Sequence, residues 1–273
     1  MTNDAVIESL RRMHAGRQLI PFVGAGLSIR LGLPSWDELI RRLAEDTGFD
    51  ADVFRTHGDV RQLAQYSVLR KGIGPIRQAI TEWFHTDDAE KRRRDSRAHY
   101  LLATGSFRRI YTTNFDEHIE RACKDNGVHH HPVANIADLQ QLKDPDATQI
   151  IKFHGSLADD ESLVLGEAAY FKRLRFEDPM DHQLRADSQQ SAFLFIGYSF
   201  QDPNIRYIWH DLAEQSKQLR QTTSGPQLRS VVVGAGYGEV QRELLQSFQI
   251  DLLDIDPTRP DDEVDEILER IVA

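Results

Sequence analysis

The sequence predicts an α/β protein built on a doubly wound parallel sheet, with a helical insertion between two of its strands. Short apolar runs alternate with segments of helical periodicity along the 273 residues, as expected for strands that are buried on both faces and joined by crossover helices. Most of these runs end in a polar or glycine-containing turn. Because parallel strands end at the same edge of their sheet, the turns are expected to meet in one crevice.

The first half of the chain predicts one strand and a group of helices. A helix is expected over residues 4–17, then a strand over Leu19–Val23 and a helix from Trp36 to about Thr47. Ser35 precedes this helix and a glutamate follows three residues later, which is the pattern of a capping box. Helical periodicity without β-branched runs continues from 51 to 101. We therefore expect a single domain spanning 1–273 with a helical insertion at roughly 48–101.

Sheet strands resume in the second half of the chain. One strand is expected through Tyr111, followed by a helix from about Phe115. Further strands, most of them followed by helices, are expected in QIIKFHGSL, SAFLFIGYSF, RSVVVGAGYG and IDLLDIDPTR. No internal repeat or low-complexity linker appears between them, so the sequence alone draws no domain boundary.

Charge and cysteine content argue against several classes of protein. The formal net charge is -10, which makes the surface as a whole a poor binder of nucleic acid, and the basic run Lys91–Arg94 is interpreted as a solvated helix end. We expect no membrane span, because no apolar run is long enough, and no signal peptide. The single cysteine, Cys123, cannot form an intramolecular disulfide, so we expect a cytoplasmic protein.

A glycine turn follows the first strand. Gly24-Ala25-Gly26 removes side chains where a helix would begin, so that backbone N–H groups could approach a phosphate. The spacing is not that of the dinucleotide fingerprint, whose third glycine would fall at Ile29, and no Gly-Lys-Ser/Thr follows. Taken alone, the turn is equally well explained as a tight strand-to-helix connection without a ligand.

Polar residues follow five of the predicted strands. The turns are Gly24-Ala25-Gly26, Thr112-Thr113-Asn114, His154-Gly155-Ser156, Gly197-Tyr198-Ser199 and Gly234-Ala235-Gly236. Each has a purely structural alternative: Asn114 with Glu117 could cap a helix, Asp202 could do the same before a proline, and His154 could bond a backbone carbonyl. Together they combine amide, imidazole, hydroxyl and bare backbone at one sheet edge, which favours a ligand cleft.

The segments GAGLS, GLPSW, TTNFD, KFHGS and FIGYSFQDPNI, in this order, resemble the sirtuin superfamily, and most closely its bacterial SIR2-like branch of anti-phage defence. The resemblance spans roughly residues 18–256. It implies a Rossmann-like domain that binds NAD, with a glycine turn that cradles the pyrophosphate, an asparagine beside the nicotinamide ribose and a histidine that acts as the catalytic base. The matching positions here are Gly24, Ala25, Gly26 and Ser28, then Asn114 and Asp116, then His154.

The chain departs from the deacetylase sirtuins at several positions. Their four-cysteine zinc module is impossible with one cysteine. In the loop Gly32–Asp37, Trp36 takes the aromatic place, where we expect it to contact NAD, and an acid replaces the family's arginine. Thr113 and Tyr198 stand where glutamine and threonine are usual. These changes are compatible with NAD binding and argue against deacetylation of a peptide.

The run His129-His130-His131 invites a metal assignment, which we do not make. Adjacent side chains on a strand point in different directions, and none of the three has a partner four residues away on a helix. We expect no metal.

Cleavage of NAD between ribose and nicotinamide requires that the sugar is held, bulk water is excluded and one nucleophile is placed. Asn114 can fix a ribose hydroxyl or a water through its amide, and His154 can accept a proton near neutral pH. With water as acceptor the products are ADP-ribose and nicotinamide, so we predict an NAD glycohydrolase. A protein deacylase or ADP-ribosyltransferase, and a non-catalytic NAD-sensing module, remain as alternatives.

The adenosine half of NAD is expected over the later strands, where Gly197, Ser199 and Gly234 end two of them. Asp256 could accept hydrogen bonds from a ribose. Asp256 followed by a proline is equally good as the opening of a turn.

Regulation is expected to come from outside the chain, because catalytic domain and helical insertion account for nearly all of it. A constitutively active enzyme would deplete the host's NAD. The resemblance includes systems in which a SIR2-like chain assembles with a HerA-type ATPase or a short Argonaute, so we expect a homo-oligomer or such a partner, packed against the helices of 51–101 and the N-terminal helix.

Overall fold

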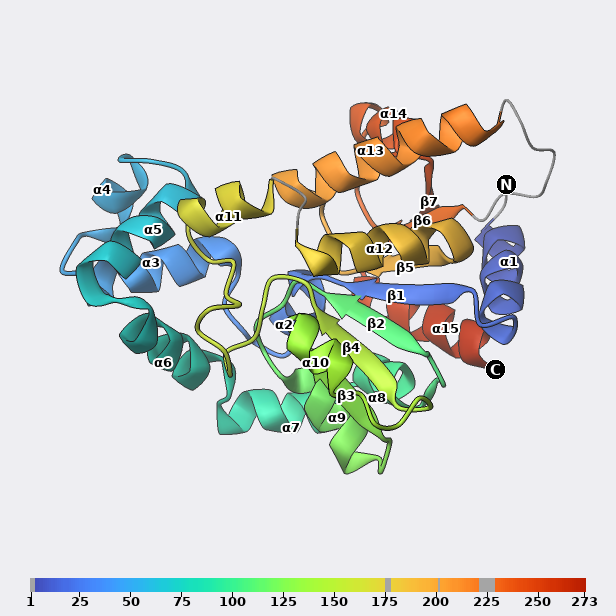
Figure 1. Ribbon diagram of the computed structural model, residues 1–273, viewed down its shortest axis with the longest axis horizontal. Helices are drawn as coiled ribbons and strands as arrows, with labels where there is room; N and C mark the ends of the chain where they lie inside the picture. The colour runs from blue at the N-terminus through green and yellow to red at the C-terminus, as the bar shows by residue number, and fades with distance from the viewer. Residues whose placement is uncertain (1–2, 175–177, 201, 221–228) are drawn as a thin grey trace.

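The computed structural model describes residues 3–174, 178–200, 202–220 and 229–273, and their centre is a seven-stranded sheet (Figure 1). The strands lie in the order β3-β4-β2-β1-β5-β6-β7, and every neighbouring pair is parallel. Their bounds are β1 (Leu19–Val23), β2 (Arg109–Thr112), β3 (His130–Val133), β4 (Thr148–Lys152), β5 (Ala192–Ile196), β6 (Ser230–Gly234) and β7 (Ile250–Asp254). The predicted Rossmann-like parallel sheet is thereby confirmed.

Helices cover both faces of the sheet, because successive strand residues point to opposite sides. In β5, Leu194 and Ile196 pack into one core and Phe193 and Phe195 into the other. The first core is closed by α1 (Asn3–Ala15), α8 (Arg97–Thr104), α9 (His118–Asp125) and α15 (Pro260–Val272). The second is closed by α10 (Ile136–Gln140), α12 (Pro179–Gln190), α13 (Pro203–Arg220) and α14 (Glu239–Ser247).

The remaining helices lie beyond the carboxyl ends of the strands, where Figure 1 shows a separate lobe on the left. Its own hydrophobic cluster includes Leu43, Phe54, Ile76 and Leu165. The helices here are α3 (Trp36–Asp46), α4 (Ala51–Arg55), α5 (Val60–Lys71), α6 (Ile73–Phe84) and α11 (Glu167–Arg173), while α2 (Ala25–Ile29) and α7 (Asp87–Asp95) lead back to the sheet. We call α3–α6 and α11 the helical lobe.

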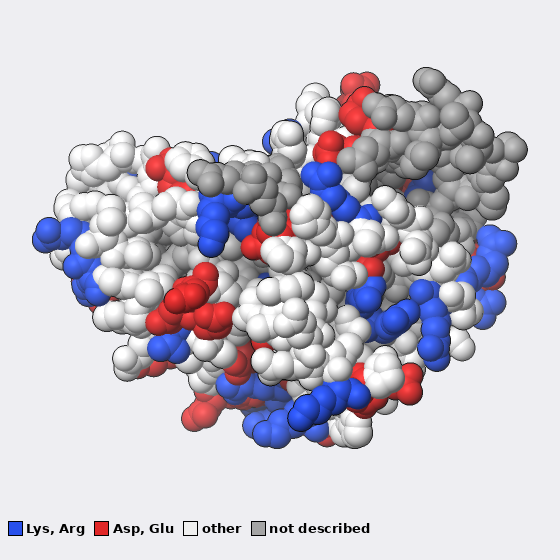
Figure 2. Space-filling model, in the orientation of Figure 1, with Lys and Arg blue, Asp and Glu red and all other residues white. Residues whose placement is uncertain are grey.

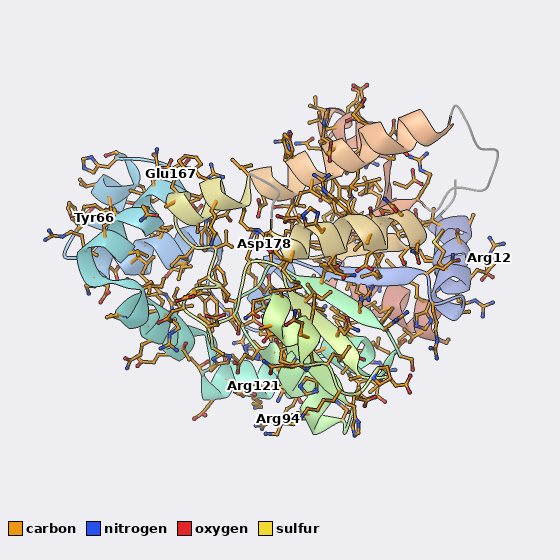
Figure 3. All side chains as sticks on the ribbon, viewed as in Figure 1. Arg12, Tyr66, Arg94, Arg121, Glu167 and Asp178 are labelled. Carbon is orange, nitrogen blue, oxygen red and sulfur yellow. The ribbon has the colours of Figure 1, made fainter. Side chains whose placement is uncertain are left out.

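Two elements of the helical lobe come from parts of the chain that are far apart in sequence. Tyr66 on α5 and Glu167 on α11 both lie in the lobe (Figure 3), and Gln62 Nε2 donates to Glu167 Oε1 over 3.1 Å. The insertion predicted at 48–101 stays a prediction. In the structure α3 shares the hydrophobic cluster of these helices and α11 packs against α5, whereas α8 packs with the sheet. No helix in the described ranges is long and apolar enough to cross a membrane.

Helix boundaries follow local capping. Ser35 Oγ accepts a hydrogen bond from the Glu38 amide over 3.2 Å, so it caps α3 as predicted, although the reciprocal bond of a full capping box is not formed. Helix α9 begins at His118 rather than near Phe115, because residues 113–117 form the turn that carries the polar residues of the cleft.

The turn after β1 packs directly against the end of β5. A Cβ atom on Gly24 would lie 2.5 Å from the Gly197 carbonyl oxygen, and one on Gly26 would lie 2.7 Å from Gly197 Cα. Gly197 itself has φ +63, in the left-handed region, and a Cβ there would lie 2.5 Å from the amide nitrogen of Leu27. The three glycines therefore allow the backbones that follow β1 and β5 to touch. This is the point where the strand order reverses, with β2 on one side of β1 and β5 on the other.

We predict that Gly26→Ala destabilises the protein by about 1–3 kcal/mol, because the added methyl group would displace the Gly197 backbone. The measurement is the free energy of unfolding in urea. Gly74→Ala in α6 is the matched control, since its Cβ would meet no atom within 4 Å, and it should be neutral or slightly stabilising. Equal unfolding midpoints for the two variants would contradict the packing argument.

Candidate functional site

A cleft of about 1010 Å³ opens at the carboxyl ends of the strands, next to the helical lobe. This is the edge at which parallel α/β sheets bind ligands. The following residues predicted from the sequence line it: Ala25, Gly26, Ser28, Trp36, Asn114, Asp116, His154, Gly197, Ser199 and Gly234. The structure thus brings together residues separated by more than 200 positions in the chain.

Asn114 is held by a directional chain of hydrogen bonds. Its Nδ2 donates to the Gly24 carbonyl over 3.0 Å and to Ser28 Oγ over 2.9 Å. The Ser28 hydroxyl in turn donates to Asp116 Oδ2 over 2.6 Å. Since a carbonyl and a carboxylate only accept, this chain fixes the direction of each bond and the orientation of the amide.

The orientation of Asn114 determines what it can offer a ligand. Both N–H groups of its amide are used within the protein, which leaves the carbonyl oxygen Oδ1 as the group available to a ligand. The helix-cap alternative does not hold, because Glu117 is the N-cap of α9 and Asn114 bonds Gly24 and Ser28 instead. Asn114 therefore acts at this edge as a fixed hydrogen-bond acceptor.

Asp116 anchors this chain from beneath the cleft. Its side chain is buried, accepts from the amide of His118 over 3.1 Å, and lies beside the buried Lys152, whose ammonium group donates to the Asp116 carbonyl and pairs with Glu120. Burial alone would raise the pKa of Asp116, but His118, Lys152 and the Ser28 hydroxyl outweigh it and hold the pKa below its ordinary value. The carboxylate therefore stays charged and keeps accepting from Ser28.

His154 follows β4 and is buried, at 4% exposure. Burial lowers the pKa of His154 below its ordinary value; the nearby Arg173 acts in the same direction, and Asp202 opposes both. The ring is therefore neutral at neutral pH and able to accept a proton.

Asp202, at the start of α13, lies next to His154. Its Oδ2 is 3.2 Å from His154 Nε2, although the two groups are not aligned as a hydrogen bond. A carboxylate can only accept, so its field favours the tautomer with hydrogen on Nε2 and leaves the lone pair on Nδ1. From the sequence, Asp202 was considered only as a helix cap. Its Oδ1 does accept a hydrogen bond from the Ile205 amide over 3.4 Å, and its carboxylate also faces His154.

The glycine turn offers fewer free backbone amides to a ligand than the sequence implied. The Gly24 amide donates to the Ile196 carbonyl and the Gly26 amide to the Gly197 carbonyl, each over 2.9 Å. Among Gly24, Ala25 and Gly26, only the Ala25 amide forms no hydrogen bond within the described ranges. The two glycines are thus explained by backbone packing, and a phosphate could meet only one amide of this turn.

The later strand ends contribute Gly197, Ser199 and Gly234 to the cleft, but not Asp256. Asp256 is exposed, and its Oδ1 accepts from the amide and hydroxyl of Thr258 over 2.8 and 2.7 Å. In the structure Asp256 thus opens a turn, as the structural alternative proposed, and it is not part of the described lining of the cleft.

Aromatic side chains and one cation complete the cleft, and the sequence did not single out most of them. Trp36 and Phe115 lie with ring centroids 6.2 Å apart, and Tyr170 of α11 packs edge-on against His154 with centroids 5.6 Å apart. Arg61 of α5 lies over the Tyr170 ring, 5.6 Å from its centroid. Arg61 is the only Lys or Arg among the described residues that line the cleft.

The histidine run does not converge on a metal. His129 Nδ1 pairs with Asp144, His130 Nδ1 contacts the Val128 carbonyl, and His131 Nε2 contacts the Asp138 carbonyl. Within the described part of the chain, no group of three or more His, Cys, Asp or Glu side chains could hold a metal ion.

Comparison with known proteins identifies the family of the chain. A family model described as a SIR2-like domain matches residues 108–253, which include Asn114, His154 and the turns after β5 and β6. The match covers more than half of the 273 residues.

Several curated relatives carry the name NAD(+) hydrolase ThsA. The protein of Bacillus cereus (strain MSX-D12) is 31% identical over 190 residues, which are 68% of this chain and 38% of the relative. That of Cytobacillus dafuensis is 29% identical over 201 residues, 74% of this chain and 39% of the relative. That of Acinetobacter baumannii (strain 532279) is 31% identical over 187 residues, 68% of this chain and 37% of the relative. The matches thus span less than two fifths of the length of these relatives.

Proposed function

The chain belongs to the SIR2-like domain family, and from this membership and the geometry of the cleft we propose that it hydrolyses NAD to ADP-ribose and nicotinamide. The observation that carries the proposal is the presence in one cleft of a fixed hydrogen-bond acceptor, Asn114, and a buried neutral imidazole, His154. Such a pair suits a reaction that needs an oriented sugar and a proton acceptor.

In this proposal Asn114 Oδ1 accepts a hydrogen bond from a hydroxyl of the nicotinamide ribose or from the attacking water. Its two N–H groups already donate to Gly24 and Ser28, so the oxygen is held without further ordering when the substrate binds. Asp116 keeps this acceptor in place from beneath the cleft.

His154 is the proposed proton acceptor. Water adds to C1′ of the ribose through an oxygen lone pair, and the bond from C1′ to the pyridinium nitrogen breaks. Its electron pair stays on nicotinamide, which leaves as a neutral molecule. One proton of the water passes to the neutral imidazole, where Asp202 stabilises the resulting charge at 3.2 Å.

The remaining parts of NAD are assigned from the lining of the cleft. We assign the pyrophosphate to the Ala25 amide and Arg61, because charge-assisted hydrogen bonds from arginine suit phosphate oxygens. The adenosine half is assigned to the strand ends that carry Gly197, Ser199 and Gly234. Trp36 is assigned to the nicotinamide side, next to Phe115.

We predict that Asn114→Ala and His154→Ala each lower the rate of NAD hydrolysis about a hundredfold to ten-thousandfold, because each removes an oriented group from the reacting ribose. The measurement is chromatographic detection of ADP-ribose with folded protein and no added peptide.

Asn126→Ala and His57→Ala are the matched controls, since the Asn126 side chain bonds a helix carbonyl and His57 is exposed. Full turnover by His154→Ala would refute the mechanism. Product formed only with an acylated peptide or an acceptor protein would indicate a deacylase or ADP-ribosyltransferase, and would refute the hydrolase.

The pH profile should reflect the lowered pKa of His154. As the pH falls, the rate should stay high below pH 6.5, the ordinary pKa of histidine, and decline only when the buried ring becomes protonated. Asp202→Asn, which removes the one neighbour that raises this pKa, should move the acid limb to still lower pH. An acid limb at or above pH 6.5 in the wild-type protein would contradict the assignment.

We also propose that the enzyme acts in the cytoplasm as an effector of anti-phage defence, gated by assembly with further copies of itself or with a HerA-type ATPase or short Argonaute. Exposed apolar side chains on the helical lobe support a docking role there: Val53, Leu69 and Phe171 are 52%, 75% and 58% exposed. Light scattering should detect an oligomer, or a complex with a neighbouring gene's product. A monomer that hydrolyses NAD at full rate alone would refute the gating.

A further inference from the structure

A second cavity, of about 350 Å³, lies at the opposite edge of the sheet, at the amino ends of β1, β2 and β5. It shares no lining residue with the cleft described above. Basic and neutral polar side chains predominate in its lining, which consists of His14, Arg17, Gln18, Leu19, Ile20, Ser106, Phe107, Arg108, Arg109, Asp187, Gln189, Gln190 and Ser191. Its volume falls at the lower end of the range of small-molecule sites.

Among the described residues only one acid, Asp187, lines this cavity, and its charge is already paired. Asp187 pairs with Arg109, and it also accepts from the Tyr111 hydroxyl over 2.6 Å and from Gln183 Nε2 over 3.1 Å. Arg17 and Arg108 form no side-chain hydrogen bond or ion pair within the described ranges. The cavity therefore carries two uncompensated positive charges in a chain whose net charge is -10.

The backbone holds two of the lining residues in an unfavourable conformation. Arg17 has φ 56 and Ser106 has φ 57, both in the left-handed region that glycine prefers. Arg17 follows the end of α1, at a place where helices commonly use glycine. Strain of this kind persists where the surrounding structure requires it and is frequent at ligand sites. At Arg17 the strained backbone places an arginine in the lining of the cavity, at a position where glycine would have relieved the strain.

Lys and Arg atoms are present on the visible face near this edge of the sheet. Figure 2 shows several of them on the right of the molecule, where Figure 1 places the amino ends of β1 and β2, and further groups along the lower edge and on the left. Hydroxyl and amide groups of Ser106, Ser191 and Gln190 supply further hydrogen-bond donors at the cavity.

We propose that this cavity binds a small phosphate-bearing ligand, of mononucleotide size or less, through Arg17 and Arg108. The planar guanidinium groups match the geometry of phosphate oxygens, and in the described part of the chain no carboxylate pairs with them. The concave shape distinguishes the site from scattered surface arginines. Because its residues are separate from those of the cleft, binding here does not depend on the proposed hydrolysis of NAD.

The test is calorimetric titration of the full chain with pyrophosphate and, in parallel, with AMP, in a phosphate-free buffer of low ionic strength. We expect saturable binding of at least one probe. Arg17→Gly and Arg108→Gln should each weaken it about tenfold or more, as expected for loss of a charge-assisted hydrogen bond. Tighter binding of AMP would identify a nucleotide ligand, and binding of pyrophosphate alone a bare phosphate group.

Arg17→Gly keeps the test independent of folding, because glycine relieves the left-handed strain and the urea midpoint should not fall. Arg12→Gln is the matched control: Arg12 also belongs to the α1 region, lies at the outer edge of the molecule in Figure 3, and does not line the cavity. Absence of binding of both probes, wild-type affinity in Arg17→Gly and Arg108→Gln, or an equal loss of affinity in Arg12→Gln would overturn the proposal.

Discussion

The contact between the backbones that follow β1 and β5 is the constraint on which the site depends. Gly24 and Gly26 can touch Gly197 only because none of the three carries a side chain. This contact fixes where α2 begins, and therefore where Ser28 presents its hydroxyl to Asn114. A bulkier residue at any of these positions would separate two central strands at the edge where the cleft opens. The same residues thus hold the sheet together and set the geometry of the polar groups.

A buried carboxylate beneath a cleft is unfavourable unless its charge and lone pairs are satisfied. At Asp116 the neighbouring Lys152, the His118 amide and the Ser28 hydroxyl supply this compensation. As a result the orientation of Asn114 is decided before any ligand arrives, because each donor along the chain has one available acceptor. Pre-organisation of this kind lowers the entropy lost on binding. It also means that the hydrogen bonds that stabilise the buried Asp116 are the ones that orient Asn114 toward the cleft.

The fold was predictable because buried parallel strands leave a strong pattern: runs such as the one in β5 are apolar throughout and end in a polar turn. Asn114 and His154 were predictable as cleft residues for the same reason. The sequence could not show that the amides of Gly24 and Gly26 donate to carbonyl groups at and just after the end of β5. It also could not show that Asp202 lies beside His154, because both contacts depend on strand order. Arg61 and Tyr170 come from the helical lobe, and no periodicity in the sequence indicates that these helices lie next to the edge of the sheet. Asp256 does not line the cleft, because a strand end does not determine the direction of the following turn.

The two edges of the sheet differ in the charged residues that line their cavities, and this difference bears on what each can bind. The described lining of the cleft includes Asp37, Asp116 and Asp202 but only one cation, Arg61. In the proposed reaction the positive charge of the nicotinamide ring moves toward the ribose carbon as the glycosidic bond breaks, so acids near the sugar would stabilise both the bound substrate and the transition state. Stabilisation of both states raises affinity more than rate, and the rate of the proposed reaction would then depend on how well Asn114 and His154 are positioned. At the amino edge, Arg17 and Arg108, which have no ion-pair partner among the described residues, line a smaller cavity. A ligand whose only charge is that of its phosphates is therefore favoured there, whereas a ligand with a cationic ring is favoured at the carboxyl edge.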